Sequence, residues 1–313
     1  MLHVCLTGQG YLDKHFSLLS QKGFQVTPIS EPLSSEELLS LLPSVDAYVL
    51  GGDERFNEPE LSVAKKLKVI SFVGTGYTSF IDEASAAKHQ IAIRSTPSVM
   101  APAVAEHTIG LAIGLQRKLF IQNWQIKQSI TAACKTEELS SLCVGIIGMG
   151  AIGSRVAKIL RHSFGSQVIY VSRHPKKSLE DALQITEVSL DTLFSTADMI
   201  ILALPTTPET ENLIDDARLA QAKPGLIIIN TAGARLINPK ALKKYIENNT
   251  VASAAFDGYY IEPLPSVTDD PYALLSLPDD KFIVTPHTAA KTSQSWCRMV
   301  DMAIDNVVGF FSD

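Results

Sequence analysis

The fold of this chain is decided by the stretch Cys143-Val144-Gly145-Ile146-Ile147-Gly148-Met149-Gly150-Ala151-Ile152-Gly153. Its apolar first half predicts a strand that runs directly into the pattern Gly-x-Gly-x-x-Gly. A helix is expected to follow over Ile152–Ser163, and a second strand over Val168–Val171. The glycines permit a tight turn, a close approach of backbone to pyrophosphate and close packing of helix on strand. This order predicts a dinucleotide site whose pyrophosphate lies at the helix N-terminus. The residues expected to form the site are Gly148, Gly150, Ala151, Ile152 and Gly153.

Selectivity between the two nicotinamide cofactors is expected to depend on the end of the second strand. An NAD site usually places a carboxylate there, which accepts hydrogen bonds from the ribose hydroxyls. This chain has Ser172 followed by Arg173 at that place. A hydroxyl can bond to a 2′-phosphate, and a guanidinium can pair with it through two hydrogen bonds. The pattern therefore favours NADP(H), while NAD(H) stays possible because an arginine can also stack on adenine.

Short apolar runs alternate with amphipathic segments along the whole chain. Several runs are continuous Val, Ile and Leu, which is typical of parallel strands buried on both faces. Besides the two strands beside the glycine loop, strands are expected over Val4–Leu6, Ala47–Leu50, Val69–Phe72, Ile91–Ile93, Met199–Ala203, Leu226–Asn230, Ala252–Phe256 and Phe282–Thr285. The alternation predicts an α/β protein with two Rossmann-like domains, each a doubly wound parallel sheet.

The glycine loop lies near the middle of the chain, so about 140 residues precede it and form their own β/α series. The segment Ala103–Leu119 is expected to be one long apolar helix that joins two domains, and a last helix is expected from about Thr292. We therefore expect an NAD(P)-binding domain, residues 98–287, inserted into a flavodoxin-like substrate domain formed by residues 1–97 and 288–313.

Composition excludes several classes of protein. The 313 residues are 46% hydrophobic and 19% charged, with a net charge of −6, which disfavours a nucleic-acid partner. No apolar stretch approaches the roughly 20 residues of a membrane helix, and the N-terminus lacks the basic region of a signal peptide. None of the four cysteines has C-x-x-C spacing, so no metal site or redox dithiol is expected. A cytoplasmic protein without a membrane partner is the expectation.

Further segments occur in a characteristic order along the chain. They are Val73-Gly74-Thr75-Gly76-Tyr77, Val104-Ala105-Glu106-His107-Thr108, Leu204-Pro205-Thr206-Thr207-Pro208-Glu209-Thr210, Asn230-Thr231-Ala232, Asp257 to Glu262-Pro263, and Thr285-Pro286-His287. With these segments the chain resembles the D-isomer-specific 2-hydroxyacid dehydrogenases over essentially its whole length. The resemblance implies an NAD(P)-dependent oxidoreductase of the glyoxylate/hydroxypyruvate reductase type, which takes a small 2-keto or 2-hydroxy acid and usually forms a homodimer.

The resemblance also implies a role for particular residues. His287 would exchange a proton with the substrate oxygen, and Glu262 would pair with His287 and hold its tautomer and charge state. Reduction of a 2-keto acid needs a proton donor near neutral pH, and a histidine backed by a carboxylate meets that need. The remaining implied roles are the substrate-carboxylate loop Gly74, Thr75 and Gly76, the nicotinamide carboxamide acceptor Asp257, and the cofactor-site residues Thr207, Thr231 and Ala232.

One position departs from the family pattern. The family has Asn-Thr-x-Arg-Gly, whose Arg binds the substrate carboxylate, whereas this chain has Gly233 at that place and Arg235 two residues later. Arg235 can reach back over a glycine-loosened loop, a nearby cation such as Lys291 can serve instead, or catalysis can be weak or lost. The last alternative predicts a dinucleotide-sensing regulatory protein on the same fold. The segment from Arg117 to Val144 is also short for the family, which weakens the expectation of a dimer.

Overall fold

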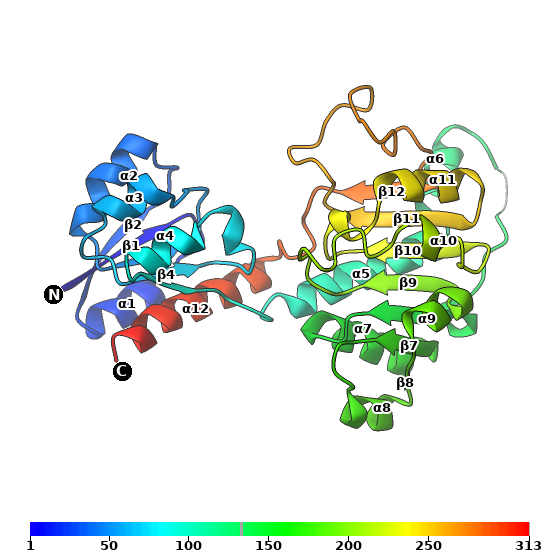
Figure 1. Cartoon of the computed structure of the whole chain (residues 1–313), viewed down its shortest axis with the longest axis horizontal. Coiled ribbons are helices and arrows are strands. Elements are labelled where there is room, and N and C mark those ends of the chain that lie inside the picture. The colour runs from blue at the N-terminus through cyan, green and yellow to red at the C-terminus, as the bar shows by residue number, and fades with distance from the viewer. Residues whose placement is uncertain (132–133, 313) are drawn as a thin grey trace. The chain divides into compact units, whose positions relative to one another are not determined.

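The computed structural model describes residues 1–131 and 134–312. The chain divides into two compact units, Met1–Met100 with Thr292–Asp313, and Ala101–Lys291 (Figure 1). The second unit is thus an insertion in the first. The boundaries predicted at residues 97/98 and 287/288 lie three and four positions before these divisions.

The first unit is built on a five-stranded parallel sheet of order β2-β1-β3-β4-β5, the strand order of flavodoxin-like folds. Its strands are β1 (Leu2–Thr7), β2 (Phe24–Ile29), β3 (Ala47–Leu50), β4 (Val69–Phe72) and β5 (Ala92–Arg94). Its helices are α1 (Asp13–Gln21), α2 (Ser35–Leu41), α3 (Glu58–Val63), α4 (Glu83–Lys88) and α12 (Ser293–Phe310). Buried residues of β1 and β3 alternate between a core shared with α12 and a core on the other face of the sheet.

The second unit is built on a seven-stranded parallel sheet of order β12-β11-β10-β9-β6-β7-β8. Its strands are β6 (Cys143–Ile147), β7 (Gln167–Val171), β8 (Thr186–Glu187), β9 (Met199–Leu202), β10 (Leu226–Asn230), β11 (Val251–Asp257) and β12 (Phe282–Thr285). Its helices are α5 (Ala101–Gln116), α6 (Leu119–Lys127), α7 (Ala151–Ile159), α8 (Lys177–Leu183), α9 (Leu190–Thr196), α10 (Asp216–Leu219) and α11 (Pro239–Glu247). From β6 the chain extends the sheet through β7 and β8 to one edge. It then returns to β9, beside β6, and extends the sheet to the other edge. Open α/β sheets bind ligands at the point of such a reversal.

The predicted α/β fold with two Rossmann-like sheets is confirmed. Two strands were missed, β2 and β8, and both lie at a sheet edge. β2 contains Pro28 and has one buried residue, Phe24, with the others partly or fully exposed. β8 is two residues long, so neither strand forms a continuous apolar run. Strands of this kind suit an edge, where a missing ladder hydrogen bond is tolerated.

The prediction of one helix over Ala103–Leu119 is wrong. α5 ends at Gln116, and Lys118 adopts a left-handed conformation with φ +52° before α6 begins at Leu119. The residues at the break, Gln116-Arg117-Lys118, are polar and do not continue the apolar pattern. The helix expected over Ile152–Ser163 is α-helical only to Ile159, and a π-helical turn continues it to Phe164.

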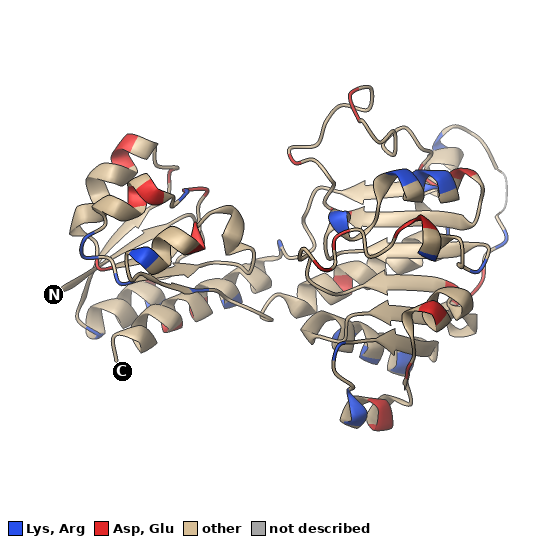
Figure 2. Ribbon diagram, in the orientation of Figure 1, with Lys and Arg blue, Asp and Glu red and all other residues tan. Residues whose placement is uncertain are grey.

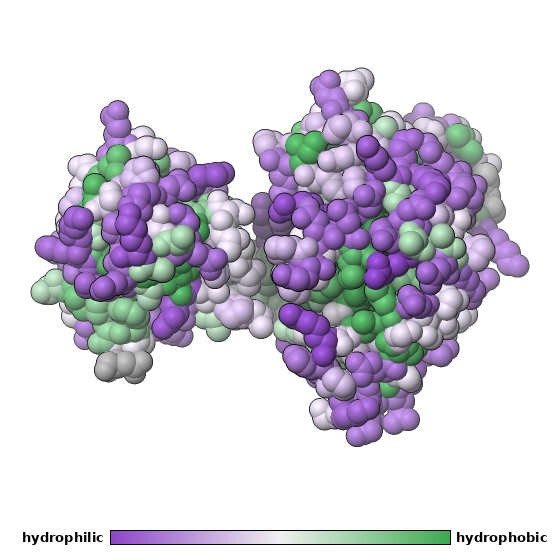
Figure 3. All heavy atoms as spheres, in the orientation of Figure 1, coloured by the Kyte–Doolittle hydropathy of each residue, from purple (hydrophilic) through white to green (hydrophobic). Residues whose placement is uncertain are grey.

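Charged residues of both signs are spread over the surface of the described residues. Figure 2 shows basic and acidic residues interspersed over both units. On the face drawn in Figure 3, hydrophilic residues surround smaller apolar groups on each unit. In residues 1–131 and 134–312, no helix combines the length and apolar character that crossing a bilayer requires.

Candidate active site

The glycine loop forms an open cradle at the carboxyl end of β6. Gly148 has φ +99°, and a Cβ on it would meet the carbonyl oxygen of Ala203. A Cβ on Gly153 would meet the carbonyl oxygen of Gly148, so the helix and loop approach closely only because both are glycine. Nothing lies within 4 Å of a Cβ on Gly150, and no side chain caps α7, which begins at the next residue. Open space beside an uncapped helix N-terminus fits a pyrophosphate.

The end of β7 places Ser172 and Arg173 at the surface. Glu209, in the loop that follows β9, lies near the guanidinium. The pKa of the Glu209 carboxyl is lowered, first by polar contact with Thr207 and further by the positive charge of Arg173. The effect of Arg173 is the smaller of the two, so Glu209 is a neighbouring charge rather than an ion-pair partner.

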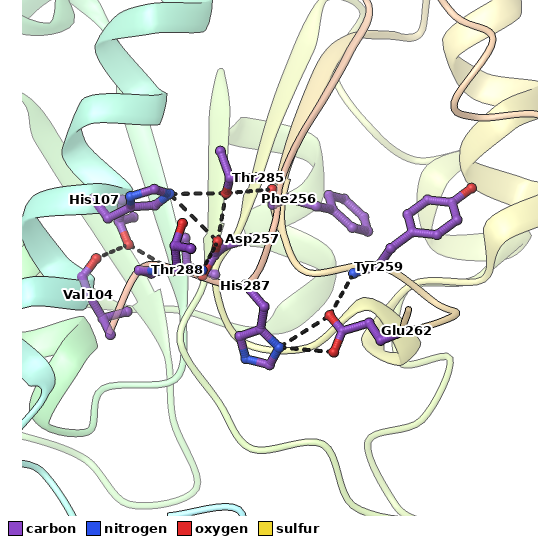
Figure 4. Close-up of polar contacts among 12 residues, drawn as sticks. Val104, His107, Phe256, Asp257, Tyr259, Glu262, Thr285, His287 and Thr288 are labelled. Atoms are coloured by element: carbon purple, nitrogen blue, oxygen red, sulfur yellow. Dashed lines mark hydrogen bonds and ion pairs between the residues drawn. The ribbon is translucent and has the colours of Figure 1, made fainter. Parts of the chain in front are cut away.

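His287 and Glu262 come together at the carboxyl end of β12 (Figure 4). The Nδ1 atom of His287 is 3.2 Å from each carboxylate oxygen of Glu262. The Oε1 atom of Glu262 also accepts a hydrogen bond from the backbone N–H of Tyr259 at 3.2 Å. When Nδ1–H donates to this carboxylate, the neutral ring has its acceptor lone pair at Nε2, where a proton can be taken up or released.

Gly258 makes room for this pair. It has φ +94°, and a Cβ on it would lie 2.8 Å from Glu262 Oε1 and 3.4 Å from His287 Nδ1. A side chain here would have both an unfavourable backbone conformation and a clash with the carboxylate. Gly258 was not predicted as a site residue, although a glycine directly after the strand that ends near Asp257 was the available signal.

The backbone around His287 is held by a buried carboxylate. Asp257, at the end of β11, accepts hydrogen bonds on Oδ1 from the Thr285 hydroxyl at 2.6 Å and from the Thr288 N–H at 2.8 Å. Its Oδ2 accepts from the Ala289 N–H at 2.7 Å. Since a carboxylate oxygen can accept two hydrogen bonds, Oδ2 keeps one acceptor position for a ligand amide.

Two residues of α5 reach the same edge of the sheet. His107 Nε2 lies 3.1 Å from the Thr285 hydroxyl oxygen and 3.8 Å from Asp257 Oδ1. The Thr108 hydroxyl is 2.7 Å from that of Thr231, which follows β10. Neither residue was predicted to have a role, although both lie in the segment Val104 to Thr108, which belongs to the family resemblance.

The loop that carries Gly233 is fixed rather than loosened. The side-chain oxygen of Asn230 accepts hydrogen bonds from the N–H groups of Ala232 and Gly233, each at 3.1 Å, and its amide donates to the carbonyl of Gly233 at 2.9 Å. An inward turn of Arg235 would have to keep or break these hydrogen bonds, and that role of Arg235 stays a prediction. A Cβ on Gly233 would meet the hydroxyl oxygen of Thr206.

The two candidate cations are both on the surface. Arg235 lies in the 3₁₀ turn Ala234–Leu236 and is exposed, and within the described ranges its guanidinium has no hydrogen-bond or ion-pair partner. Lys291 is also exposed. Among the residues that the structure describes, no cluster of His, Cys, Asp and Glu is arranged to hold a metal ion.

The loop Gly74–Gly76 belongs to the first unit and follows β4. The carbonyl of Gly74 accepts hydrogen bonds from the N–H and the hydroxyl of Thr96, at 2.8 and 3.2 Å. In the part of the chain that the structure describes, the N–H groups of Thr75 and Gly76 donate to no other group. Two free backbone donors in succession suit a carboxylate or another oxyanion.

The uncapped glycine loop at the switch point of a parallel sheet defines a protein that binds a nicotinamide dinucleotide or a closely related one. Residues 109–289 match the family model described as "D-isomer specific 2-hydroxyacid dehydrogenase, NAD binding domain". The chain therefore belongs to the D-isomer specific 2-hydroxyacid dehydrogenase family of oxidoreductases.

Individual relatives agree with this assignment. Hydroxypyruvate reductase of Thermotoga maritima is 33% identical over 291 residues, which are 92% of each chain. Glyoxylate/hydroxypyruvate reductase B of Yersinia pestis is 28% identical over 302 residues, 95% of this chain and 88% of the relative. The crystal structure of a D-lactate dehydrogenase from Treponema pallidum superposes with a TM-score of 0.83 at 25% identity, covering 97% of this chain and 95% of the other.

Replacing Gly258 by alanine tests whether the His287–Glu262 contact depends on this glycine. Gly258→Ala is expected to separate the pair and to lower kcat by about 10-fold to 100-fold, because the ring loses its orientation. The ¹⁵N chemical shifts of the His287 imidazole report the tautomer directly. Gly225→Ala is the matched control, since Gly225 has φ +88° but nothing within 4 Å of its Cβ position. Equal losses of kcat in the two variants would show that backbone strain alone, and not the clash with Glu262, lowers the activity.

Proposed function

We propose that the chain is an NADP(H)-dependent enzyme that interconverts a small 2-keto acid and a D-2-hydroxy acid, with His287 as the acid/base. The observation that carries the proposal is the contact of His287 Nδ1 with Glu262, on a turn fixed by Asp257, in the unit that holds the glycine loop. In reduction, a bound nicotinamide supplies the hydride to the keto carbon. His287 supplies the proton from Nε2 to the keto oxygen.

The other site residues are proposed to bind and orient the two reactants. Gly148 to Gly153 would hold the pyrophosphate, and Thr207, Thr231 and Ala232 would line the nicotinamide side of the cofactor site. The remaining acceptor position on Asp257 Oδ2 suits the nicotinamide carboxamide. The free N–H groups of Thr75 and Gly76 would bind the substrate carboxylate. The names of the Thermotoga and Yersinia relatives support a short 2-keto acid such as hydroxypyruvate or glyoxylate.

A homodimer is proposed on the evidence of α6. None of its residues is buried, and four of its large apolar side chains are exposed, with Trp124 at 49% and Ile126 at 59%. Apolar residues gathered on one exposed element usually mark an interface. A second copy of this chain is the proposed occupant, because the family resemblance implies a homodimer. The shortness of the segment Arg117 to Val144 counts against it, so the proposal depends on the exposed apolar side chains of α6.

Removal of the proposed proton donor tests the function itself. His287→Ala is expected to lower kcat for NADPH-dependent reduction of hydroxypyruvate or glyoxylate by about 10²-fold to 10⁴-fold with cofactor binding intact. Glu262→Gln is expected to lower kcat as well, because the carboxylate that orients the His287 ring is lost. Wild-type protein that binds NADPH but reduces no short 2-keto acid would favour a dinucleotide-sensing protein instead.

Cofactor selectivity is expected to depend on Arg173. Arg173→Ala should raise KM for NADPH by about 10-fold or more and leave KM for NADH nearly unchanged, because a charge-assisted contact to the 2′-phosphate is lost. Glu209→Gln should act in the opposite direction, because it removes a negative charge near this cation. Lys177→Ala, which removes a lysine of the same basic segment that pairs with Glu180, is the control. Equal kcat/KM for the two cofactors in the wild type would contradict the proposal.

The cation for the substrate carboxylate is proposed to be Arg235, whose long side chain would have to reach inward from a fixed loop. Arg235→Ala should raise KM for the keto acid several-fold more than KM for NADPH. Adding Gly233→Arg together with Thr206→Ala should then restore part of the affinity, since the Thr206 hydroxyl fills the space that a side chain at 233 needs. If Arg235→Ala is silent and Lys291→Ala raises KM for the keto acid, Lys291 holds this role instead.

A further inference from the structure

The Thr285 hydroxyl lies at the centre of a polar chain that begins on α5. Its oxygen is 2.6 Å from Asp257 Oδ1, 3.1 Å from His107 Nε2 and 3.3 Å from the carbonyl oxygen of Phe256 (Figure 4). A hydroxyl has one hydrogen to donate and two lone pairs with which to accept. The shortest contact is to the carboxylate, so the Thr285 hydroxyl donates its hydrogen bond to Asp257. His107 must then be the donor, through Nε2–H.

The same carboxylate fixes the turn that carries His287. Asp257 accepts from the N–H groups of Thr288 and Ala289, the two residues that directly follow His287. His287 itself has φ +54°, a left-handed conformation that is uncommon for a residue with a side chain. The direction in which the imidazole points thus depends on Asp257.

The tautomer of His107 decides whether this arrangement holds. With its hydrogen on Nδ1 instead, His107 Nε2 would accept, and the Thr285 hydrogen would turn toward the imidazole. Asp257 Oδ1 would then face an oxygen lone pair at 2.6 Å, a repulsive contact. Donation from His107 Nε2–H therefore supports the bond from Thr285 to Asp257, whereas the other tautomer competes with it.

We propose that His107 is a positioning residue for proton transfer, acting through Thr285 and Asp257 on the turn Pro286–Ala289. The proposal rests on the proposed role of His287 as acid/base. His107 is assigned no contact with substrate or cofactor. The side chain of His107 is 26% exposed, and that of Asp257 is 2% exposed. The hydrogen-bonded chain therefore runs from a partly exposed imidazole to a buried carboxylate.

Paired variants of His107 and Thr285 test the proposal. His107→Phe and Thr285→Val remove the hydrogen bonds with little change of volume, and each is expected to lower kcat by about 10-fold to 100-fold while KM for NADPH changes by less than about twofold. His107→Gln and Thr285→Ser keep a donor and a hydroxyl, and should retain most of kcat. The double variant His107→Phe/Thr285→Val should be no worse than Thr285→Val alone, because both changes break one path.

A second readout separates this proposal from the proposed function. The ¹⁵N shifts of the His287 imidazole, measured without cofactor, should change in His107→Phe and Thr285→Val and stay as in the wild type in His107→Gln. An inactive wild type with these shift changes would refute the proposed function and support the positioning chain. An active enzyme whose kcat and His287 shifts are unmoved by both substitutions would overturn it. If His107→Phe does not fold, Thr285→Val decides alone.

Discussion

The site of this protein depends on one buried carboxylate, that of Asp257. A charge removed from water is costly unless donors satisfy it, and Asp257 finds three, one side-chain hydroxyl and two backbone N–H groups. Those donors belong to the end of β12 and to the turn after it. The hydrogen bonds that satisfy Asp257 therefore hold the end of β11 against the end of β12. They also stabilise the positive φ of His287, which the backbone preference of a residue with a side chain disfavours.

Parallel strand order explains why residues far apart in sequence lie at one edge of the second unit. All carboxyl ends of a parallel sheet point the same way, so the loops that follow the strands share an edge. The residues assigned to that edge follow successive strands: Gly148 after β6, Ser172 after β7, Thr207 after β9, Thr231 after β10, Asp257 at the end of β11 and His287 after β12. The glycines of the first loop then leave this edge open for a large anion.

Sequence patterns predicted the parts of this arrangement that depend on local order. Continuous apolar runs predicted β3, β4, β10 and β12 to the residue, and motif order indicated His287 and Glu262. The bend at Lys118 was not predicted, because helix patterns do not reveal a left-handed residue. The Asn230 hydrogen bonds and the contact of His107 with Thr285, 178 positions away, depend on tertiary structure that no local pattern contains.

Gly233 changes the charge balance of the edge. Where the family pattern has a cation, this chain has a glycine held by Asn230 and the neutral hydroxyl of Thr206 beside it. Asp257 and Glu262 are both acidic, so the carboxylates next to His287 bring negative charge to this edge. If His287 is the acid/base that we propose, a substrate carboxylate needs a cation from another part of the chain, and Arg235 is our candidate. The geometry set by Gly258 and Asp257 would then orient the imidazole, while binding of the substrate anion would depend on a different loop.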